Sequence, residues 1–180
     1  MEKNINNWYV ITGSPCSGKS TILKELQKMG FMVVEEVART YINQEIAKGK
    51  TLEEIRKNEY LFQKKILTMK INLEKKLPKQ KIIFFERGIP DSIAYFKLIG
   101  RDIKKERLLE KSLNQCFYKK VFLLQLLDYK KDYARVETKK QAQLLETLLQ
   151  KSYAYVNIPL IKIPKLPIKE RLKVILTHLK

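Results

Sequence analysis

Cysteine and histidine are nearly absent from this chain of 180 residues. It contains two cysteines, Cys16 and Cys116, and one histidine, His178. Two cysteines are too few for a disulfide framework, and none of the three residues has the spacing of a metal site. A Ser-His-Asp or Cys-His catalytic arrangement is not supported either. The sequence therefore excludes the disulfide-rich, Cys/His-metal and histidine-based catalytic classes.

Long apolar runs are also lacking. No stretch approaches the roughly 20 consecutive apolar residues of a membrane-spanning helix, and the N-terminus has no apolar signal segment. We therefore expect a soluble, cytoplasmic protein. With 180 residues, 44% of them hydrophobic, we expect one domain with one core over residues 1–180.

Acidic residues are few relative to basic ones. Lys and Arg number 37 and Asp and Glu number 19, which gives a net charge of +18. Such an excess can attract an anionic partner such as phospholipid or nucleic acid. Most of the basic residues are lysines scattered along the predicted helices, however, and no aromatic-rich RNA-binding motif accompanies them. A solvated, lysine-rich surface is the simpler interpretation, and both stay open.

The most informative pattern is G-x-x-x-x-G-K-S, which runs from Gly13 to Ser20. It is typical of the phosphate-binding loops of nucleoside-triphosphate enzymes, whose glycines let backbone N–H groups surround a phosphate. Lys19 would reach the β- and γ-phosphates, and the Ser20 hydroxyl is placed to bind Mg²⁺. Cys16 is either a redox-sensitive thiol or simply a small residue that fits the loop. We expect the nucleotide to be bound by Gly13, Ser14, Pro15, Cys16, Ser17, Gly18, Lys19, Ser20 and Thr21.

Apolar runs typical of buried strands alternate with helical patterns along the chain. The predicted strands are 8–12, 31–34, 82–85, 121–124 and 160–163. A capping box formed by Thr51 and Glu54 predicts a helix that runs toward Lys76. Five short strands alternating with helices predict an α/β fold, a five-stranded parallel sheet with helices on both faces. In such folds ligands bind beyond the carboxyl ends of the strands.

An acidic residue follows the most apolar of these strands. Glu86 ends the run Ile82–Phe85, and a carboxylate there can hold Mg²⁺ directly or through water, or act as general base for an acceptor hydroxyl. Arg87 could bind an acceptor or the transferring phosphoryl group. The alternative for Glu86 is a charged residue at a strand end without a function.

Three more residues are candidates for binding an acceptor. Glu36 and Arg39 follow the second predicted strand at a spacing that puts them on one helix face, where a surface ion pair is the alternative. Asp91 lies one turn beyond Arg87, where it could instead cap a helix.

The segment 128–137 is rich in charge and carries Arg135. In small phosphotransferases a mobile basic segment closes over the phosphates and excludes water. We expect 128–137 to be such a lid, with Arg135 gripping phosphate through its planar fork. A solvated loop is the alternative.

Four motifs occur in order: TGSPCSGKS at 12–20, EVAR at 36–39, ERGIPDS at 86–92 and DYARVE at 132–137. Together they resemble the small P-loop "AAA domain" family of ATPase/kinase-like proteins, which is related to the nicotinamide-riboside kinase domain of the bacterial NAD regulator. The resemblance covers nearly the whole chain. It implies a three-layer α/β/α P-loop NTPase fold of the nucleoside/nucleotide-kinase type, nucleotide phosphates at 13–21, and Arg135 as the lid arginine.

The leading hypothesis is a Mg²⁺-dependent phosphotransferase or NTPase that uses ATP or GTP, with an unidentified small-molecule acceptor. Lys19 and Arg135 would stabilise the γ-phosphoryl group, and Ser20 and Glu86 would bind Mg²⁺. One alternative is a nucleotide-dependent binding module that holds phospholipid or nucleic acid, and another is hydrolysis without an acceptor. The residues expected to line the acceptor pocket are Glu36, Arg39, Arg87 and Asp91.

Overall fold

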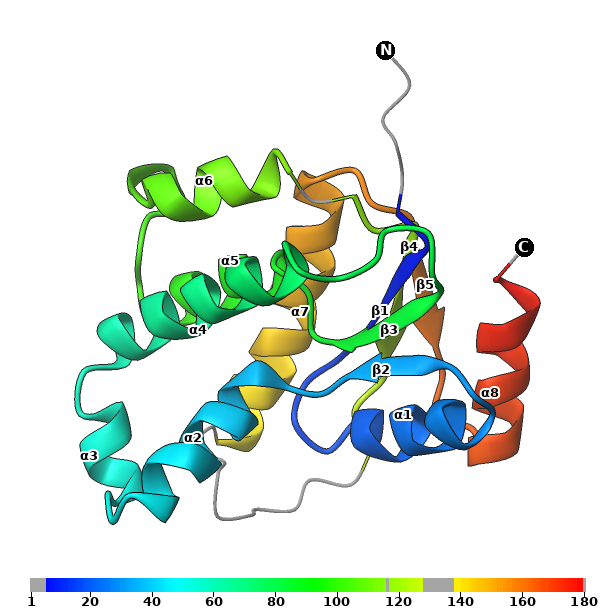
Figure 1. Ribbon diagram of the computed structural model, residues 1–180, viewed down its shortest axis with the longest axis horizontal. Coiled ribbons are helices and arrows are strands. Elements are labelled where there is room, and N and C mark those ends of the chain that lie inside the picture. The colour runs from blue at the N-terminus through cyan, green and yellow to red at the C-terminus, as the bar shows by residue number, and fades with distance from the viewer. Residues whose placement is uncertain (1–5, 116, 128–137, 180) are drawn as a thin grey trace.

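The computed structural model describes residues 6–115, 117–127 and 138–179, which are built around a five-stranded sheet (Figure 1). The strands lie in the order β2-β3-β1-β4-β5, and every neighbouring pair is parallel. The predicted α/β fold with a parallel five-stranded sheet is confirmed. The strand bounds are β1 (Trp8–Thr12), β2 (Met32–Val34), β3 (Ile83–Glu86), β4 (Lys120–Leu124) and β5 (Leu160–Ile163).

The central strands form where they were predicted because each is a short apolar run buried on both faces. Every residue of β1 and β3 is buried. Successive side chains of a strand point to opposite faces, so Tyr9 and Ile11 join one core while Trp8 and Val10 join another. The sheet is therefore the middle layer of three.

Two groups of helices cover the two faces (Figure 1). On one face, α1 (Lys19–Lys28) and α8 (Ile168–Thr177) pack against each other and against the side of the sheet that carries Tyr9. On the other face lie α4 (Glu59–Glu74), α5 (Asp91–Leu98) and α7 (Lys139–Tyr155). The remaining helices are α2 (Val37–Ala47), α3 (Leu52–Arg56), a 3₁₀ turn at Ile103–Lys105 and α6 (Arg107–Leu113).

The prediction of one helix from Thr51 toward Lys76 is wrong. The capping box of Thr51 and Glu54 is present, but α3 ends at Arg56. Asn58 then starts a new helix, because its side chain accepts a hydrogen bond from the Leu61 backbone N–H at 3.0 Å. The break lets α4 turn back toward the sheet, where Phe62 and Ile66 are buried with Val37 of α2.

The carboxyl ends of the parallel strands meet at one edge of the sheet. β1 is central, and the chain moves from it first to β2 and β3 on one side and then to β4 and β5 on the other. The direction of winding reverses beside β1, and ligands bind at such a reversal in α/β folds. The loop after β1, the start of α2 and the turn after β3 lie together at this edge.

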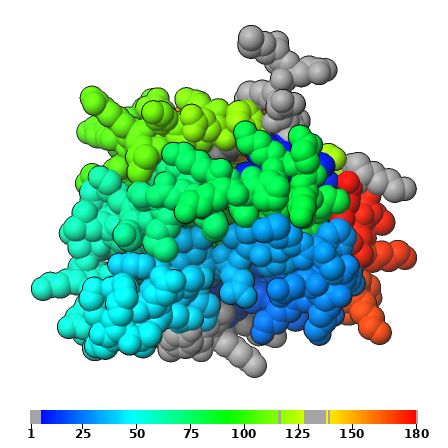
Figure 2. Space-filling model, viewed as in Figure 1, coloured from blue at the N-terminus to red at the C-terminus, as the bar shows by residue number. Residues whose placement is uncertain are grey.

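The space-filling view shows α6 along the top, α2 and α3 at the lower left, α1 at the lower right and α8 at the right edge (Figure 2). Over the described ranges, none of the helices combines the length and apolar character that crossing a membrane requires.

Candidate functional site

The loop between β1 and α1 has the backbone of an anion-binding site. Gly13 has φ +147° and Gly18 has φ +85°, conformations that glycine adopts without strain. A Cβ at Gly13 would lie 2.5 Å from the Leu124 carbonyl oxygen and 2.6 Å from Ser17 Oγ, so a side chain does not fit there. Because α1 starts directly after Gly18, the positive end of its dipole adds to the loop N–H groups.

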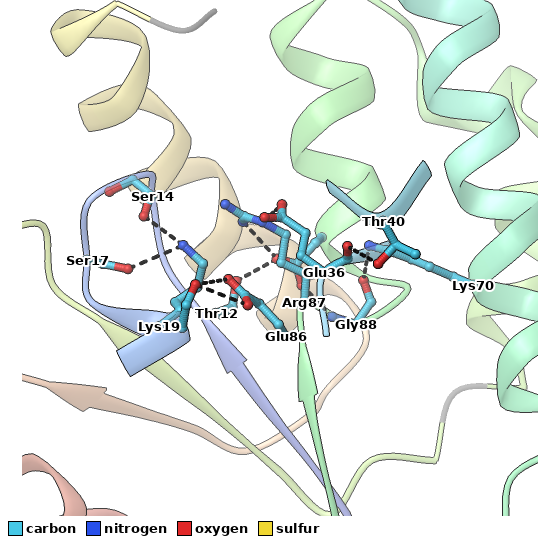
Figure 3. Close-up of polar contacts among 12 residues, drawn as sticks. Thr12, Ser14, Ser17, Lys19, Glu36, Thr40, Lys70, Glu86, Arg87 and Gly88 are labelled. Atoms are coloured by element: carbon cyan, nitrogen blue, oxygen red, sulfur yellow. Dashed lines mark hydrogen bonds and ion pairs between the residues drawn. The ribbon is translucent and has the colours of Figure 1, made fainter. Parts of the chain in front are cut away.

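Lys19 lies over this loop (Figure 3). Its side chain is buried, and Nζ donates to the Ser14 carbonyl oxygen at 3.0 Å and lies 3.5 Å from Ser17 Oγ. Burial and the nearby Arg87 guanidinium lower the pKa of Lys19 to about 8. The ammonium group is therefore held beside the place where the loop would bind phosphate.

Ser20 and Glu86 come together from α1 and β3. The Ser20 hydroxyl donates to the Glu86 carboxylate, with 3.3 Å to each oxygen. Burial and the negative charge of Glu36 raise the pKa of Glu86. A cation between these oxygens would relieve that repulsion, and a hydroxyl with a carboxylate is a ligand set suited to Mg²⁺. Their chemistry thus fits the magnesium ion that P-loop enzymes use.

No group of three or more His, Cys, Asp and Glu that could hold a metal occurs among the described residues. A magnesium ion at Ser20 and Glu86 would consequently need oxygen ligands from elsewhere, and nucleotide phosphates supply them in kinase-type sites.

Arg87 forms an ion pair with Glu36 in the site (Figure 3). It has φ +66°, a conformation that side chains rarely adopt. Its Nε donates to Glu36 Oε1 at 2.8 Å, and its guanidinium lies 5.2 Å from the Tyr95 ring centroid. Burial alone would raise the pKa of Glu36, but the charges of Arg87 and Lys19 outweigh it and lower that pKa to about 2.

Asp91 lies behind Arg87. It is fully buried, and its carboxylate accepts hydrogen bonds from Thr12 Oγ1 at 2.5 Å, the Gly88 N–H at 3.0 Å, Arg87 Nη1 at 3.3 Å and the Tyr153 hydroxyl. It does not line the cavity, and it does not cap α5, whose N-cap is Pro90. Its four donors make it a support for the turn that carries Arg87.

One cavity of about 490 Å³ joins these groups. The phosphate loop lines one end, and Glu36, Glu86 and Arg87 lie at the middle. Side chains from α2 to α5 line the other end. They are mostly aromatic, apolar or cationic, with one amide: Arg39, Ile42, Arg56, Phe62, Gln63, Ile66, Lys70 and Tyr95.

A chain of hydrogen bonds fixes the amide at the far end. Arg56 donates to both carboxylate oxygens of Glu59, at 2.9 and 2.7 Å, and lies over the Phe62 ring at 4.9 Å from its centroid. Glu59 in turn accepts from Gln63 Nε2 at 2.8 Å. The Gln63 amide nitrogen is thereby engaged, and among the described residues no donor contacts its carbonyl oxygen, which can therefore act as an acceptor.

At this end of the cavity the sequence motifs include Arg39, but neither Phe62 nor Gln63. Only the break at Asn58 and the packing of α4 beside α2 and α5 bring them to the site. Arg135 and the whole predicted lid 128–137 lie outside the described residues. Cys116, for which no site role was predicted, lies outside them as well. Lys19, Ser20, Glu36, Arg39, Glu86 and Arg87 all line one cavity.

The parallel sheet and the glycine loop that joins β1 to α1 define a P-loop α/β fold. The sequence profile of the AAA domain family matches residues 8–171, and the chain belongs to that family. Among curated proteins, none matches the chain in sequence.

Several solved structures have the same fold. Deoxyadenosine kinase from M. mycoides with products dCMP and dCDP is 18% identical with a TM-score of 0.68, over 96% of this chain and 97% of that one. Thymidylate kinase from Ehrlichia chaffeensis is 15% identical with a TM-score of 0.66, over 97% and 98%. NadR protein in complex with NAD and AMP-PNP is 15% identical with a TM-score of 0.72, over 97% of this chain and 50% of that one.

Proposed function

We propose that the protein transfers the γ-phosphoryl group of ATP or GTP, with Mg²⁺, to a hydroxyl group of a nucleoside. The observation that carries the proposal is the continuity of one cavity from the phosphate loop, past two carboxylates and an arginine, to an end lined by Phe62, Gln63 and Tyr95. Hydrolysis alone needs no such second compartment, whereas transfer requires donor and acceptor to be held together away from water.

The donor end would hold the triphosphate. Backbone N–H groups of the loop and the Lys19 ammonium offset the phosphate charge. Ser20 and Glu86 would hold Mg²⁺, which when bound neutralises charge that develops on the phosphate oxygens. We predict that Arg135 places a further positive charge over the γ-phosphoryl group.

The middle of the cavity would orient the acceptor. In the transfer, the acceptor oxygen bonds to the γ-phosphorus, the bond from that phosphorus to the bridging oxygen breaks, and the hydroxyl proton passes to a carboxylate. Glu36 would orient the acceptor, because its low pKa keeps the carboxylate ionised at neutral pH and ready to accept a hydrogen bond from the hydroxyl, and phosphoryl transfer depends mainly on such positioning. Arg87, fixed between Glu36 and Asp91, supplies positive charge beside it.

The far end favours a flat, partly polar ring. Phe62 and Tyr95 can contact the faces of a planar heterocycle, and the carbonyl oxygen of Gln63 can accept from an N–H on its edge. Deoxyadenosine kinase and thymidylate kinase, whose folds this chain shares, act on substrates that contain such rings. A nucleoside combines the ring with a primary hydroxyl.

An acceptor screen tests the proposal. Purified protein is incubated with Mg²⁺ and ATP or GTP against deoxyadenosine, deoxycytidine, thymidine and nicotinamide riboside, while phosphorylated product and free phosphate are both measured. We expect at least one nucleoside to be phosphorylated, and Lys19→Ala to abolish the transfer. Free phosphate at the same rate with every acceptor would instead identify an NTPase. Nucleotide-dependent binding to anionic vesicles or RNA without turnover would favour a binding module.

A further inference from the structure

A buried arginine from the last helix lies directly behind the phosphate loop. Arg171 is on α8 and is only 2% exposed, which makes it the largest fully buried side chain described. Its Nη1 donates to the Ser17 carbonyl oxygen at 2.8 Å. A Cβ built on Gly18 would lie 3.4 Å from the same nitrogen, so the guanidinium is packed against the turn where the loop enters α1.

The charge of Arg171 is poorly compensated. Within the described parts of the chain, neither Nε nor Nη2 has a hydrogen-bond partner, and no carboxylate forms an ion pair with this guanidinium. Burial without a compensating charge lowers the pKa of Arg171. An unpaired buried cation is costly in a folded protein, so its place beside an anion-binding loop points to a ligand that offsets the cost.

We propose that Arg171 is a positioning residue of the nucleotide site, which fixes the Ser17–Gly18 peptide and provides a permanent positive charge behind the phosphate loop. This inference rests on the nucleotide binding in the proposed function. When Arg171 donates to the Ser17 carbonyl, it polarises the peptide bond to Gly18, whose N–H belongs to the loop, and hydrogen bonds in such chains strengthen one another. A bound polyphosphate then offsets the buried charge.

The proposal predicts that removing the charge of Arg171 weakens nucleotide binding but leaves stability nearly unchanged. Arg171→Met keeps a long side chain and removes the charge. Unliganded Arg171→Met should unfold within a few degrees of wild type, because the lost hydrogen bond is offset by removal of two unpaired buried donors. Its affinity for triphosphate should fall at least tenfold. A residue that only packs α8 against the loop would lower the unfolding temperature and leave the affinity of the folded protein unchanged.

The test is calorimetric binding of a non-hydrolysable ATP analogue and of the matching GTP analogue, both with Mg²⁺, to the full chain. Three variants are compared with wild type: Arg171→Met, Arg171→Lys, and the control Lys173→Met, which removes an exposed charge from the same helix. We expect Lys173→Met to bind like wild type, Arg171→Lys to lose part of the affinity, and Arg171→Met to lose the most. The loss should be the same for both nucleotides, because the charge acts on their shared phosphates.

Two results overturn the inference. If folded Arg171→Met binds both analogues as wild type does, the residue does not serve the site. Should Arg171→Met not fold, the neutral variant Arg171→Gln is measured in its place. A loss restricted to one nucleotide would show a contact with the base instead. If wild type binds neither analogue, the proposed function itself fails, which the wild-type titration shows separately.

Discussion

The charge on Lys19 depends on the residues around it. Because burial and Arg87 lower its pKa to about 8, the ammonium form dominates only below that pH in the unliganded protein. A triphosphate would bind the charged form, so binding would take up a proton at higher pH. The affinity of the proposed nucleotide site would therefore depend on pH through the titration of this one residue.

We predict that the dissociation constant of Mg²⁺-ATP is flat from about pH 6.5 to pH 8 and rises above pH 8, by up to tenfold per pH unit. Calorimetric titrations across this range measure it. Lys19→Ala should bind weakly at every pH, and Lys24→Ala, an exposed lysine on the same helix, should follow wild type. An affinity that stays constant up to pH 9.5 contradicts the assignment.

The two glutamates after β2 offer a matched pair. Glu35 is exposed, while Glu36 lines the cavity and pairs with Arg87. We predict that Glu36→Gln lowers kcat for acceptor phosphorylation by at least 100-fold, because the amide accepts no proton. Its nucleotide affinity should be unchanged or tighter, since a negative charge near the phosphates is removed. Glu35→Gln should behave as wild type, and equal effects of both substitutions would exclude a specific role for Glu36.

At the scale of elements, α7 supports the site through the hydroxyl of Tyr153. The Tyr153 hydroxyl donates to Asp91, which in turn holds Arg87 and the turn after β3. α7 packs closely against α5 and begins directly after the segment 128–137. The position of Arg87 therefore depends on contacts between helices that are far apart in sequence.

We predict that Tyr153→Phe destabilises the protein by about 1–2 kcal/mol, because a buried acceptor loses one donor, and lowers kcat more than it changes the nucleotide affinity. For a chain of this size each kcal/mol corresponds to roughly 2–4 °C in Tm. Tyr155→Phe is the control, because Tyr155 lies on the same helix and is 59% exposed. Equal Tm values for the two variants would show that the Tyr153 hydroxyl does not stabilise the buried Asp91 carboxylate.

A second contact between elements should respond to pH. The Tyr118 hydroxyl, just before β4, donates to Glu74 of α4 and accepts from the Ile89 N–H. Burial raises the pKa of Glu74 from 4.5 to about 7, against the opposing effects of Tyr118 and Lys70. Because the pKa of Glu74 is higher in the folded protein than in the unfolded chain, protonated Glu74 stabilises the fold. This stabilisation is complete below the unfolded pKa of 4.5 and is lost as the pH rises to the folded pKa of about 7.

Relative to Glu74→Gln, wild type should therefore lose about 1.4 kcal/mol of unfolding free energy per pH unit between about pH 4.5 and pH 7. Urea denaturation of both proteins at several pH values measures the difference. A difference that does not change over this range would show that Glu74 titrates normally.

At the scale of the whole molecule, the fold was largely predictable. The central strands β1, β3 and β4 are apolar runs that are largely buried, and the edge strands β2 and β5 are short and mostly apolar, so all five could be located. Their alternation with helices predicted the sheet. The motif residues that the structure describes meet because parallel strands end at the same edge. The break at Asn58 was missed because the apolar pattern continues across it while a single side chain caps the next helix.

The remainder of the site depends on packing that no local pattern encodes. Asp91 was expected in the acceptor pocket, yet Thr12 and Tyr153, 79 and 62 residues away, hold it behind Arg87. Arg171 contacts the loop from 154 residues away. Gln63 reaches the cavity only because α4 packs beside α2 and α5. Such contacts follow from the order of helices around the sheet, which sequence periodicity does not specify.

The central claim is that one cavity brings a triphosphate and a nucleoside hydroxyl together. The most direct measurement follows the γ-phosphate of labelled ATP and GTP in the presence of Mg²⁺ and saturating nucleoside, and determines how much label reaches the nucleoside and how much appears as free phosphate. We predict that most of the label is found on the nucleoside in wild type and that Glu36→Gln nearly eliminates it. Label released only as free phosphate, at a rate that no nucleoside changes, would contradict the claim.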